Sequence, residues 1–147
     1  MTGLSVSNIE FMFIAETKLR VRYIETDQMG FVYHSHYFQY FEVARAEAIR
    51  NLGYTYAEME KEGVMMPVVE VQAKYLRPAV YDQLLTIRTA LKELPLNHKI
   101  EFHQEVLNEN GELLVSGRVV LYFMDMKTKK RHIMPGILLQ KLQPYFS

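Results

Sequence analysis

The chain has 147 residues, of which 49% are hydrophobic and 23% charged, so it has the length and composition of one globular domain with a substantial core. Its 17 Lys and Arg residues balance its 17 Asp and Glu residues, and this neutrality argues against a nucleic-acid partner. The absence of cysteine excludes disulfides, thiolate nucleophiles and thiolate metal ligands, and is compatible with a reducing compartment.

The N-terminal segment indicates no targeting signal. It lacks the basic region of a signal peptide, and no apolar run in the chain approaches the ~20 residues that a membrane helix needs. We therefore expect a cytoplasmic protein that does not insert into a membrane. We assign residues 1–147 to a single domain, with residues 1–15 as a polar leader and residues 135–147 as a C-terminal helix.

The first predicted elements are a strand and a long helix. Residues 16–24 alternate polar and apolar side chains, the period of a half-buried strand. Residues 35–52 repeat apolar side chains at helical spacing, with Ser35 as the expected N-cap and Gly53 just beyond the end. The apolar arc of this helix is wide, so we expect the helix to be covered on more than one side. The connection between strand and helix contains Asp27.

The second half of the chain is predicted to be mostly β. A short helix is expected over residues 54–63, followed by strands at 67–77, 83–91, 99–106 and 113–126, with a hairpin at Asn110-Gly111. Pro135 can open a closing helix whose inward side chains are Ile137, Leu138, Leu142 and Tyr145. The strand at 113–126 is apolar on both faces, which indicates subunit contact as well as core. One long helix with a run of antiparallel strands predicts an α+β architecture in which the sheet curls around the helix.

The position of Asp27 is the strongest chemical feature. Its carboxylate is expected beside a helix N-terminus, whose unpaired N–H groups can stabilise a developing oxyanion. A thioester suits such a site because its leaving thiol has a pKa near ~8.5 and needs little help from a general acid. Asp27 can attack the carbonyl or activate water, and the sequence leaves both roles open. Considered alone, the Asp-Gln-Met-Gly sequence is typical of an Asx turn.

The residues around Asp27 resemble a known family. The pattern that carries the resemblance is Tyr23-x-x-x-Asp27-x-x-Gly30-x-Val32-x-His34-x-x-Tyr37. It is similar to the hotdog-fold acyl-CoA thioesterases, closest to the 4-hydroxybenzoyl-CoA thioesterase family and its Tol-Pal-associated bacterial members. The resemblance covers residues 16–140, because it continues through Val71-x-x-x-Tyr75-x-x-Pro78-Ala79 and Lys130-Arg131-x-x-x-Pro135.

The resemblance implies a fold and an activity. The fold is a curled, antiparallel, five-stranded sheet wrapped around a long central helix. The activity is hydrolysis of an acyl-CoA to a free carboxylic acid and CoA, with acyl carrier protein as another possible carrier of the acyl group. Members assemble as homodimers or homotetramers with the site at the subunit interface, and no cofactor is implied.

The resemblance also implies roles for individual residues. Asp27 matches the catalytic carboxylate, and the backbone N–H of His34 matches the oxyanion donor. Tyr23 and the His34 side chain would orient groups around Asp27, while Gly30 supports the turn. Two helix carboxylates, Glu42 and Glu47, are fallback candidates for the catalytic role, because a second branch of these enzymes places its carboxylate on the central helix.

The phosphates of CoA require basic residues near the site. The candidates within family-like or strand-end segments are Arg77, Arg88, Lys130 and Arg131, of which the last two belong to a basic cluster with Lys127 and Lys129. His34 and His36 lack a third metal ligand, so no metal site is expected.

Two other functions fit the same fold. A 3-hydroxyacyl or enoyl thioester dehydratase or hydratase needs a His and carboxylate pair for proton transfer at carbon, but the His-Phe-Pro sequence of those enzymes is replaced by His34-Ser35-His36-Tyr37. A non-catalytic module that binds acyl-CoA or acyl carrier protein is the third possibility. The sequence leaves open the acyl chain length, aromatic against aliphatic preference, and dimer against tetramer.

Overall fold

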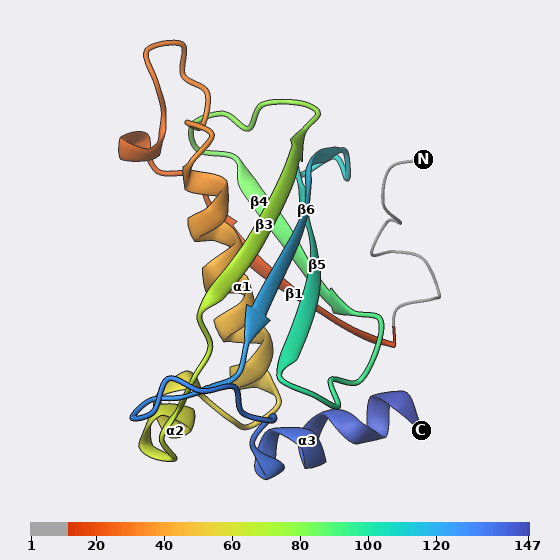
Figure 1. The fold of residues 1–147 in the computed structure, drawn as a ribbon. Coiled ribbons are helices and arrows are strands. Elements are labelled where there is room, and N and C mark those ends of the chain that lie inside the picture. Colours follow the sequence, from red (N-terminus) through yellow and green to blue (C-terminus); the bar gives the residue numbers. More distant parts are fainter. Residues whose placement is uncertain (1–11) are drawn as a thin grey trace.

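The computed structural model describes residues 12–147 and contains the predicted antiparallel sheet and long helix (Figure 1). The sheet has the strand order β1-β4-β5-β6-β3. Its strands are β1 (Phe13–Arg20), β3 (Val68–Tyr75), β4 (Leu84–Leu91), β5 (Lys99–Leu107) and β6 (Leu113–Tyr122). The long helix, α1 (His36–Asn51), runs along one face of the sheet. The expected α+β architecture with five antiparallel strands is therefore confirmed.

Smaller elements gather at one end of the sheet. The predicted short helix is α2 (Tyr56–Lys61), and it is followed by β2 (Val64–Met65), which pairs with β7 (Met124–Asp125). The strand predicted at 113–126 is thus two strands, β6 and β7. Strand β2 was not predicted, because two residues are too few to show an alternation of polar and apolar side chains. The chain closes with α3 (Gly136–Leu142) and a 3-10 helix, Gln143–Phe146. Figure 1 shows α2 and α3 at the same end of the sheet.

The core lies between α1 and the sheet. In β5, which the sequence predicts at residues 99–106, the alternate side chains of Ile100, Phe102, Gln104 and Val106 are all buried on the helix side. Phe41 of α1 is fully buried against β6, where a Cβ atom on Gly117 would lie only 2.5 Å from its ring. Glycine at position 117 therefore allows the close approach of helix and sheet that this core requires.

The first strand begins and ends earlier than the sequence predicts. Strand β1 pairs with β4 from Phe13, so residues 13–15, assigned to the leader, belong to the sheet, and residues 1–11 of the predicted leader lie outside the described residues. After Arg20 the chain leaves the sheet and forms a 3-10 helix, Tyr23–Glu25. The buried Glu25 side chain stabilises this helix by accepting hydrogen bonds from the Arg22 backbone N–H and the Tyr40 hydroxyl. Tyr23 therefore lies in a 3-10 helix, and the prediction that it lies in a strand is wrong.

Two further details at helix ends differ from expectation. Ser35 has a helical backbone (φ −68°, ψ −22°), and its side chain caps nothing, because the turn before α1 is closed by the backbone bond from the His36 N–H to the Tyr33 carbonyl. In α3, Leu138 and Leu142 are buried as expected, but Ile137 is 47% exposed, because it lies on the opposite face of this short helix. Tyr145 is half exposed, yet its ring packs edge-on against Phe13. No helix within residues 12–147 is long and apolar enough to cross a bilayer.

The β3 edge of the sheet carries exposed apolar side chains. Nothing pairs with the outer side of β3 within the part of the chain described, since β6 is its neighbour on the other side. Val68, Val71 and Tyr75 are each at least 40% exposed, and so is Val43 on α1. An unpaired edge strand with exposed valines is a template for pairing with another strand.

Candidate active site

The Asp27 turn holds one carboxylate oxygen and leaves the other available. Asp27 Oδ1 accepts hydrogen bonds from the backbone N–H groups of Met29 (2.8 Å) and Phe31 (3.2 Å), and the Asp27 carbonyl accepts from the Gly30 N–H (3.0 Å). Gly30 has φ +82°, which glycine adopts without strain. The Asx turn is therefore confirmed. Within residues 12–147, Asp27 Oδ2 has no hydrogen-bond partner, and the side chain is exposed.

A buried glutamate anchors this turn to the body of the protein. Glu25 Oε1 accepts from the Tyr40 hydroxyl of α1 (2.8 Å) and from the Arg22 backbone N–H (2.8 Å), and Oε2 accepts from the Arg22 guanidinium. Burial by itself would raise the pKa of Glu25, but the hydrogen bonds from Arg22 and Tyr40 outweigh it and hold the pKa below its ordinary value of 4.5. Glu25 thus fixes the segment that enters the Asp27 turn.

We expect Glu25→Gln to lower the free energy of unfolding by about 2 kcal/mol at pH 7, because hydrogen bonds to an ionised group are lost. Since the folded pKa is lowered, this stabilisation is complete above the unfolded pKa of about 4.5 and is lost as the pH falls through the folded pKa. Urea unfolding at a series of pH values from 7 to 3 should show the gap between wild type and variant narrowing with acidity. A gap that does not change with pH would contradict an ionised, stabilising Glu25.

His34 occupies the turn that precedes α1. Its backbone N–H has no acceptor among the described residues, and its carbonyl accepts a long hydrogen bond from the Tyr75 hydroxyl of β3 (3.3 Å). The Tyr37 hydroxyl accepts from the Ala79 N–H (3.0 Å) and ties α1 to the segment that follows β3. Tyr75 therefore positions the His34 peptide. The sequence places Tyr75 in a family-like segment, but no pattern links it to His34, which is 41 residues away.

A pocket of about 320 Å³ brings several predicted site residues together. We call it the Asp27 pocket, and its lining includes Asp27, His34, Tyr37, Tyr75 and Arg77. The lining also contains Phe31, Val32, Leu76 and Pro78, so the pocket has apolar walls around one carboxylate and one guanidinium. A thioester carbonyl placed here would have Asp27 and an unpaired helix N-terminal N–H within the same site.

Tyr23 does not line this pocket. Its side chain is 77% exposed, and its ring packs edge-on against Tyr81 at a centroid distance of 5.6 Å. Gly30 also lies outside the lining, but its positive φ closes the turn that presents Asp27. The structure thus brings Asp27 and His34 together, and it places the Tyr23 ring away from them.

The predicted CoA-binding residues are dispersed within one chain. Arg77 lines the Asp27 pocket and forms an ion pair with Glu112. Arg88 lies on the sheet face that points away from α1, where it pairs with Glu16 of β1 (2.6 Å). Lys130 and Arg131 follow β7, and the Arg131 guanidinium lies 5.5 Å from the centre of the Tyr122 ring. Arg77 alone among these four lines the pocket of Asp27 in the chain described.

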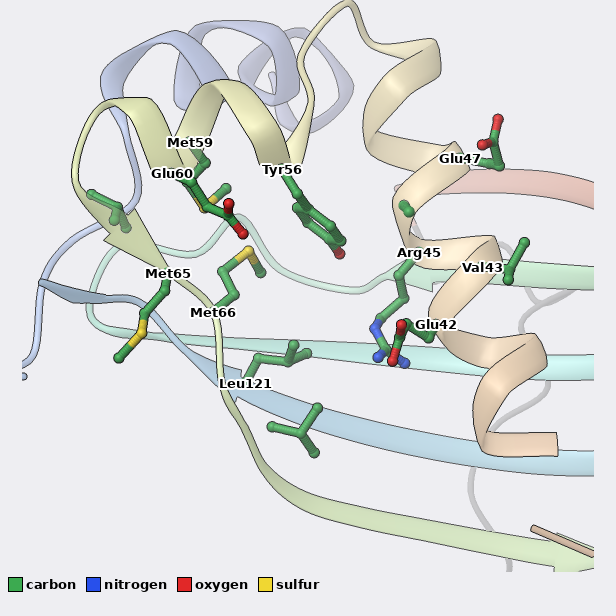
Figure 2. Close-up of a pocket in the computed structure, with 13 residues that line it drawn as sticks. Glu42, Val43, Arg45, Glu47, Tyr56, Met59, Glu60, Met65, Met66 and Leu121 are labelled. Carbon is green, nitrogen blue, oxygen red and sulfur yellow. The ribbon is translucent and has the colours of Figure 1, made fainter. Parts of the chain in front are cut away.

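A second pocket, of about 390 Å³, lies at the other end of β3 (Figure 2). We call it the Arg45 pocket. Val68, the first residue of β3, lines it, whereas Tyr75, the last residue of β3, lines the Asp27 pocket. Its other lining residues are Glu42, Val43, Arg45, Ala46, Glu47, Tyr56, Met59, Glu60, Val64, Met65, Met66 and Leu121. Both fallback carboxylates, Glu42 and Glu47, therefore belong to this pocket and not to that of Asp27.

Arg45 is the buried cation of the second pocket. Its side chain leaves α1 into the core, where Nη1 donates to Gln104 Oε1 (3.0 Å) and the Gln104 amide donates to the Phe41 carbonyl (2.9 Å). Arg45 is only 5% exposed, and this burial lowers its pKa, opposed by the nearby Tyr56 and Glu42. A buried arginine was not predicted, because its spacing in the helix is that of an ordinary polar residue.

The chain is similar to several known proteins. A model of the thioesterase-like superfamily matches residues 21–142. The "Putative acyl-CoA thioesterase YneP" of Bacillus subtilis is 36% identical over 71% of this chain and 75% of that protein. The "Acyl-CoA thioester hydrolase YbgC" of Escherichia coli O6:H1 is 30% identical over 82% of this chain and 90% of its own length. The crystal structure of a DHNA-CoA thioesterase from Staphylococcus aureus superposes with a TM-score of 0.77 at 32% identity, covering 90% of this chain and 83% of that one.

Proposed function

Because the chain belongs to the thioesterase-like superfamily and has its hotdog fold, we propose that it is an acyl-CoA thioesterase whose catalytic carboxylate is Asp27. The observation that carries the proposal is the Asp27 pocket, in which a carboxylate with one unengaged oxygen and the free N–H of His34 share an apolar-walled site. The names of the relatives YneP and YbgC support acyl-CoA as the substrate.

The proposed chemistry uses few groups. Asp27 Oδ2 either attacks the thioester carbonyl, forming a mixed anhydride and expelling the CoA thiolate, or deprotonates a water that attacks it. In the first route, water then cleaves the anhydride and regenerates Asp27. In both routes, the carbonyl oxygen becomes an oxyanion that accepts a hydrogen bond from the His34 N–H beside the positive end of α1. This hydrogen bond should stabilise the transition state by about 3 kcal/mol. Met29 and Phe31 hold Oδ1, which fixes the carboxylate during the reaction.

We further propose that the complete site forms between two copies of the chain. The outer edge of β3 has no partner strand within residues 12–147 and carries exposed valines, so two copies can join β3 to β3 in antiparallel fashion about a two-fold axis. This pairing brings the Tyr75 end of one strand to the Val68 end of the other. The Asp27 pocket of one copy then meets the Arg45 pocket of its partner, and the acyl group can extend from the first into the second.

The same pairing suggests where the CoA phosphates bind. Arg77 stands in the Asp27 pocket of one copy. Arg131 forms a β-bridge with Met124, and Met124 pairs with Met65, which lines the Arg45 pocket. In the proposed pairing, Lys130 and Arg131 of the partner therefore lie on the side of Arg77. Arg88, on the far face of the sheet, is the least favoured of the four. The assignment to the 4-hydroxybenzoyl-CoA branch and its Tol-Pal-associated members, delivery by acyl carrier protein, a tetramer and a cytoplasmic location all stay predictions.

A thiol-release assay tests the proposed function. Purified protein should release CoA from at least one member of a panel of short, medium, long and aromatic acyl-CoAs, at above ~1 per second. The matched assay for the dehydratase alternative follows formation of the enoyl product from a 3-hydroxyacyl-CoA. Absence of thiol release from every member, with acyl-CoA still bound, would overturn the thioesterase proposal and favour a binding module.

A further inference from the structure

Tyr37 is a buried tyrosine of the Asp27 pocket that the chemistry described above does not use. It lies in the first turn of α1, and it lines the pocket although only 2% of its surface is exposed. Its ring contacts two other tyrosines, edge-on with Tyr40 at a centroid distance of 5.8 Å and tilted against Tyr75 at 5.6 Å. Aromatic packing therefore fixes the position of the ring, and with it the position of the hydroxyl.

The Tyr37 hydroxyl accepts a hydrogen bond but donates none within residues 12–147. It accepts from the backbone N–H of Ala79 (3.0 Å), and no acceptor in this part of the chain takes its own proton. A hydroxyl can accept and donate at the same time. Burial raises the pKa of Tyr37, and the Ala79 N–H offsets this only in part, so the hydroxyl keeps its proton at neutral pH. The pocket thus contains a donor that a ligand can use.

This hydroxyl lies on the side of the pocket from which we expect CoA to enter. Ala79, which donates to it, follows Arg77 by two residues, and Arg77 is a predicted CoA-binding residue that lines the pocket. The Arg77 side chain is 63% exposed, so it lies at the mouth of the pocket. If the carbonyl oxygen of the thioester is at the His34 N–H and the acyl group enters the partner's pocket, the sulfur lies toward the segment that holds Arg77 and Ala79.

Expulsion of the CoA thiolate is the step that gains most from a donor at this place. After attack by Asp27, the tetrahedral intermediate can expel either the carboxylate or the thiolate. A carboxylate is the weaker base by several pKa units, so it leaves more readily and the thioester is regenerated. Stabilisation of negative charge on the sulfur reverses this preference. A hydrogen-bond donor beside the sulfur provides such stabilisation, and more strongly in a buried site than in water.

We propose that the Tyr37 hydroxyl donates a hydrogen bond to the thioester sulfur as CoA leaves. When the C–S bond breaks, its electron pair passes to the sulfur, the electron pair of the oxyanion re-forms the carbonyl, and the mixed anhydride with Asp27 remains. Tyr37 keeps its proton because a phenol is a weaker acid than a thiol, and the thiolate takes a proton from water after release. The inference rests on the proposed function and deepens it by adding a catalytic residue at the leaving group.

Thioesters with different leaving groups test this role. One substrate is the best acyl-CoA of the wild type, and the other is the S-(4-nitrophenyl) thioester of the same acid, whose thiolate is stable without a hydrogen bond. Tyr37→Phe keeps the ring that packs against Tyr40 and Tyr75 and removes only the hydroxyl. It should lower kcat/KM about thirtyfold for the acyl-CoA, because a hydrogen bond to a charged group is lost, and less than about threefold for the nitrophenyl thioester.

The comparison of two substrates separates this role from a structural one. Tyr37→Phe also leaves the Ala79 N–H without its acceptor, so it should unfold at a lower temperature than the wild type. A smaller folded fraction lowers both rates by the same factor and leaves their ratio unchanged. Tyr40→Phe is the matched control, because it removes a buried hydroxyl from the same helix that donates to Glu25 and lies outside the pocket lining. Its two rates should change by the same factor.

The outcomes separate the inference from the proposed function. Equal factors for the two thioesters in Tyr37→Phe, or a larger loss with the nitrophenyl thioester, would overturn the inference and leave the thioesterase intact. A loss in Tyr40→Phe that depends on the leaving group in the same way would also overturn it, because the effect would then not require a donor in the pocket. Absence of thiol release from every acyl-CoA by the wild type would overturn the proposed function and the inference together.

Discussion

Asp27→Asn should reduce kcat for acyl-CoA hydrolysis by a hundredfold or more, with the fold unchanged. The substituted amide oxygen can still accept from the Met29 and Phe31 N–H groups, so the turn is kept. The amide neither attacks a thioester nor removes a proton from water, so both routes proposed for Asp27 are closed. Steady-state thiol release with the best substrate of the wild type measures the effect, and circular dichroism checks the fold.

Asp27→Ala is the informative companion to this variant. It removes the acceptor for both N–H groups as well as the reactive oxygen, so it should lose activity and also unfold at a lower temperature than Asp27→Asn. If Asp27→Asn keeps most of the wild-type kcat while Glu42→Gln or Glu47→Gln loses it, the catalytic carboxylate is on α1, and the assignment of Asp27 is wrong.

The sequence predicts the elements whose side chains have a regular period. The alternation around Phe102 in β5 and the helical spacing around Phe41 in α1 both reflect burial on one face, and both agree with the structure. The prediction that Tyr23 lies in a strand was wrong because the strand ends before the buried Glu25, which accepts a hydrogen bond from the hydroxyl of Tyr40, 15 residues later. The spacing of apolar side chains along the chain carries no information about such a contact between distant residues.

The site was predictable only in part, for a similar reason. The turn at Asp27 and Gly30 could be predicted, because an Asx turn followed by a glycine with positive φ has a recognisable local sequence. The Tyr75 contact with His34 and the Arg45 contact with Gln104 join residues far apart in the chain, and only the fold brings them together. A residue on a strand or helix acquires such a role from its neighbours in space, which hydrophobic patterning does not specify.

The unpaired edge of β3 leads to the second prediction with a large effect, that Val71→Lys should abolish most activity by separating the two copies. Val71 is near the middle of β3 and is 40% exposed in the single chain, so a lysine there is tolerated by an isolated copy. In an antiparallel pairing about a two-fold axis, the two lysines would meet near its centre, where like charges are strongly unfavourable. Light scattering should report a monomer, and thiol release should fall at least fiftyfold at the same chain concentration.

Ile137→Lys provides the control for an added charge, because Ile137 is 47% exposed on α3, away from β3. It should keep both the assembly and the activity of the wild type. Assembly and activity are linked because the proposed site forms between two copies. Separation of the copies leaves each Asp27 without the partner's Arg45 pocket to hold the acyl group. A monomeric Val71→Lys with wild-type kcat/KM would mean that one chain contains the whole site, and the Arg45 pocket would then have no access to the thioester.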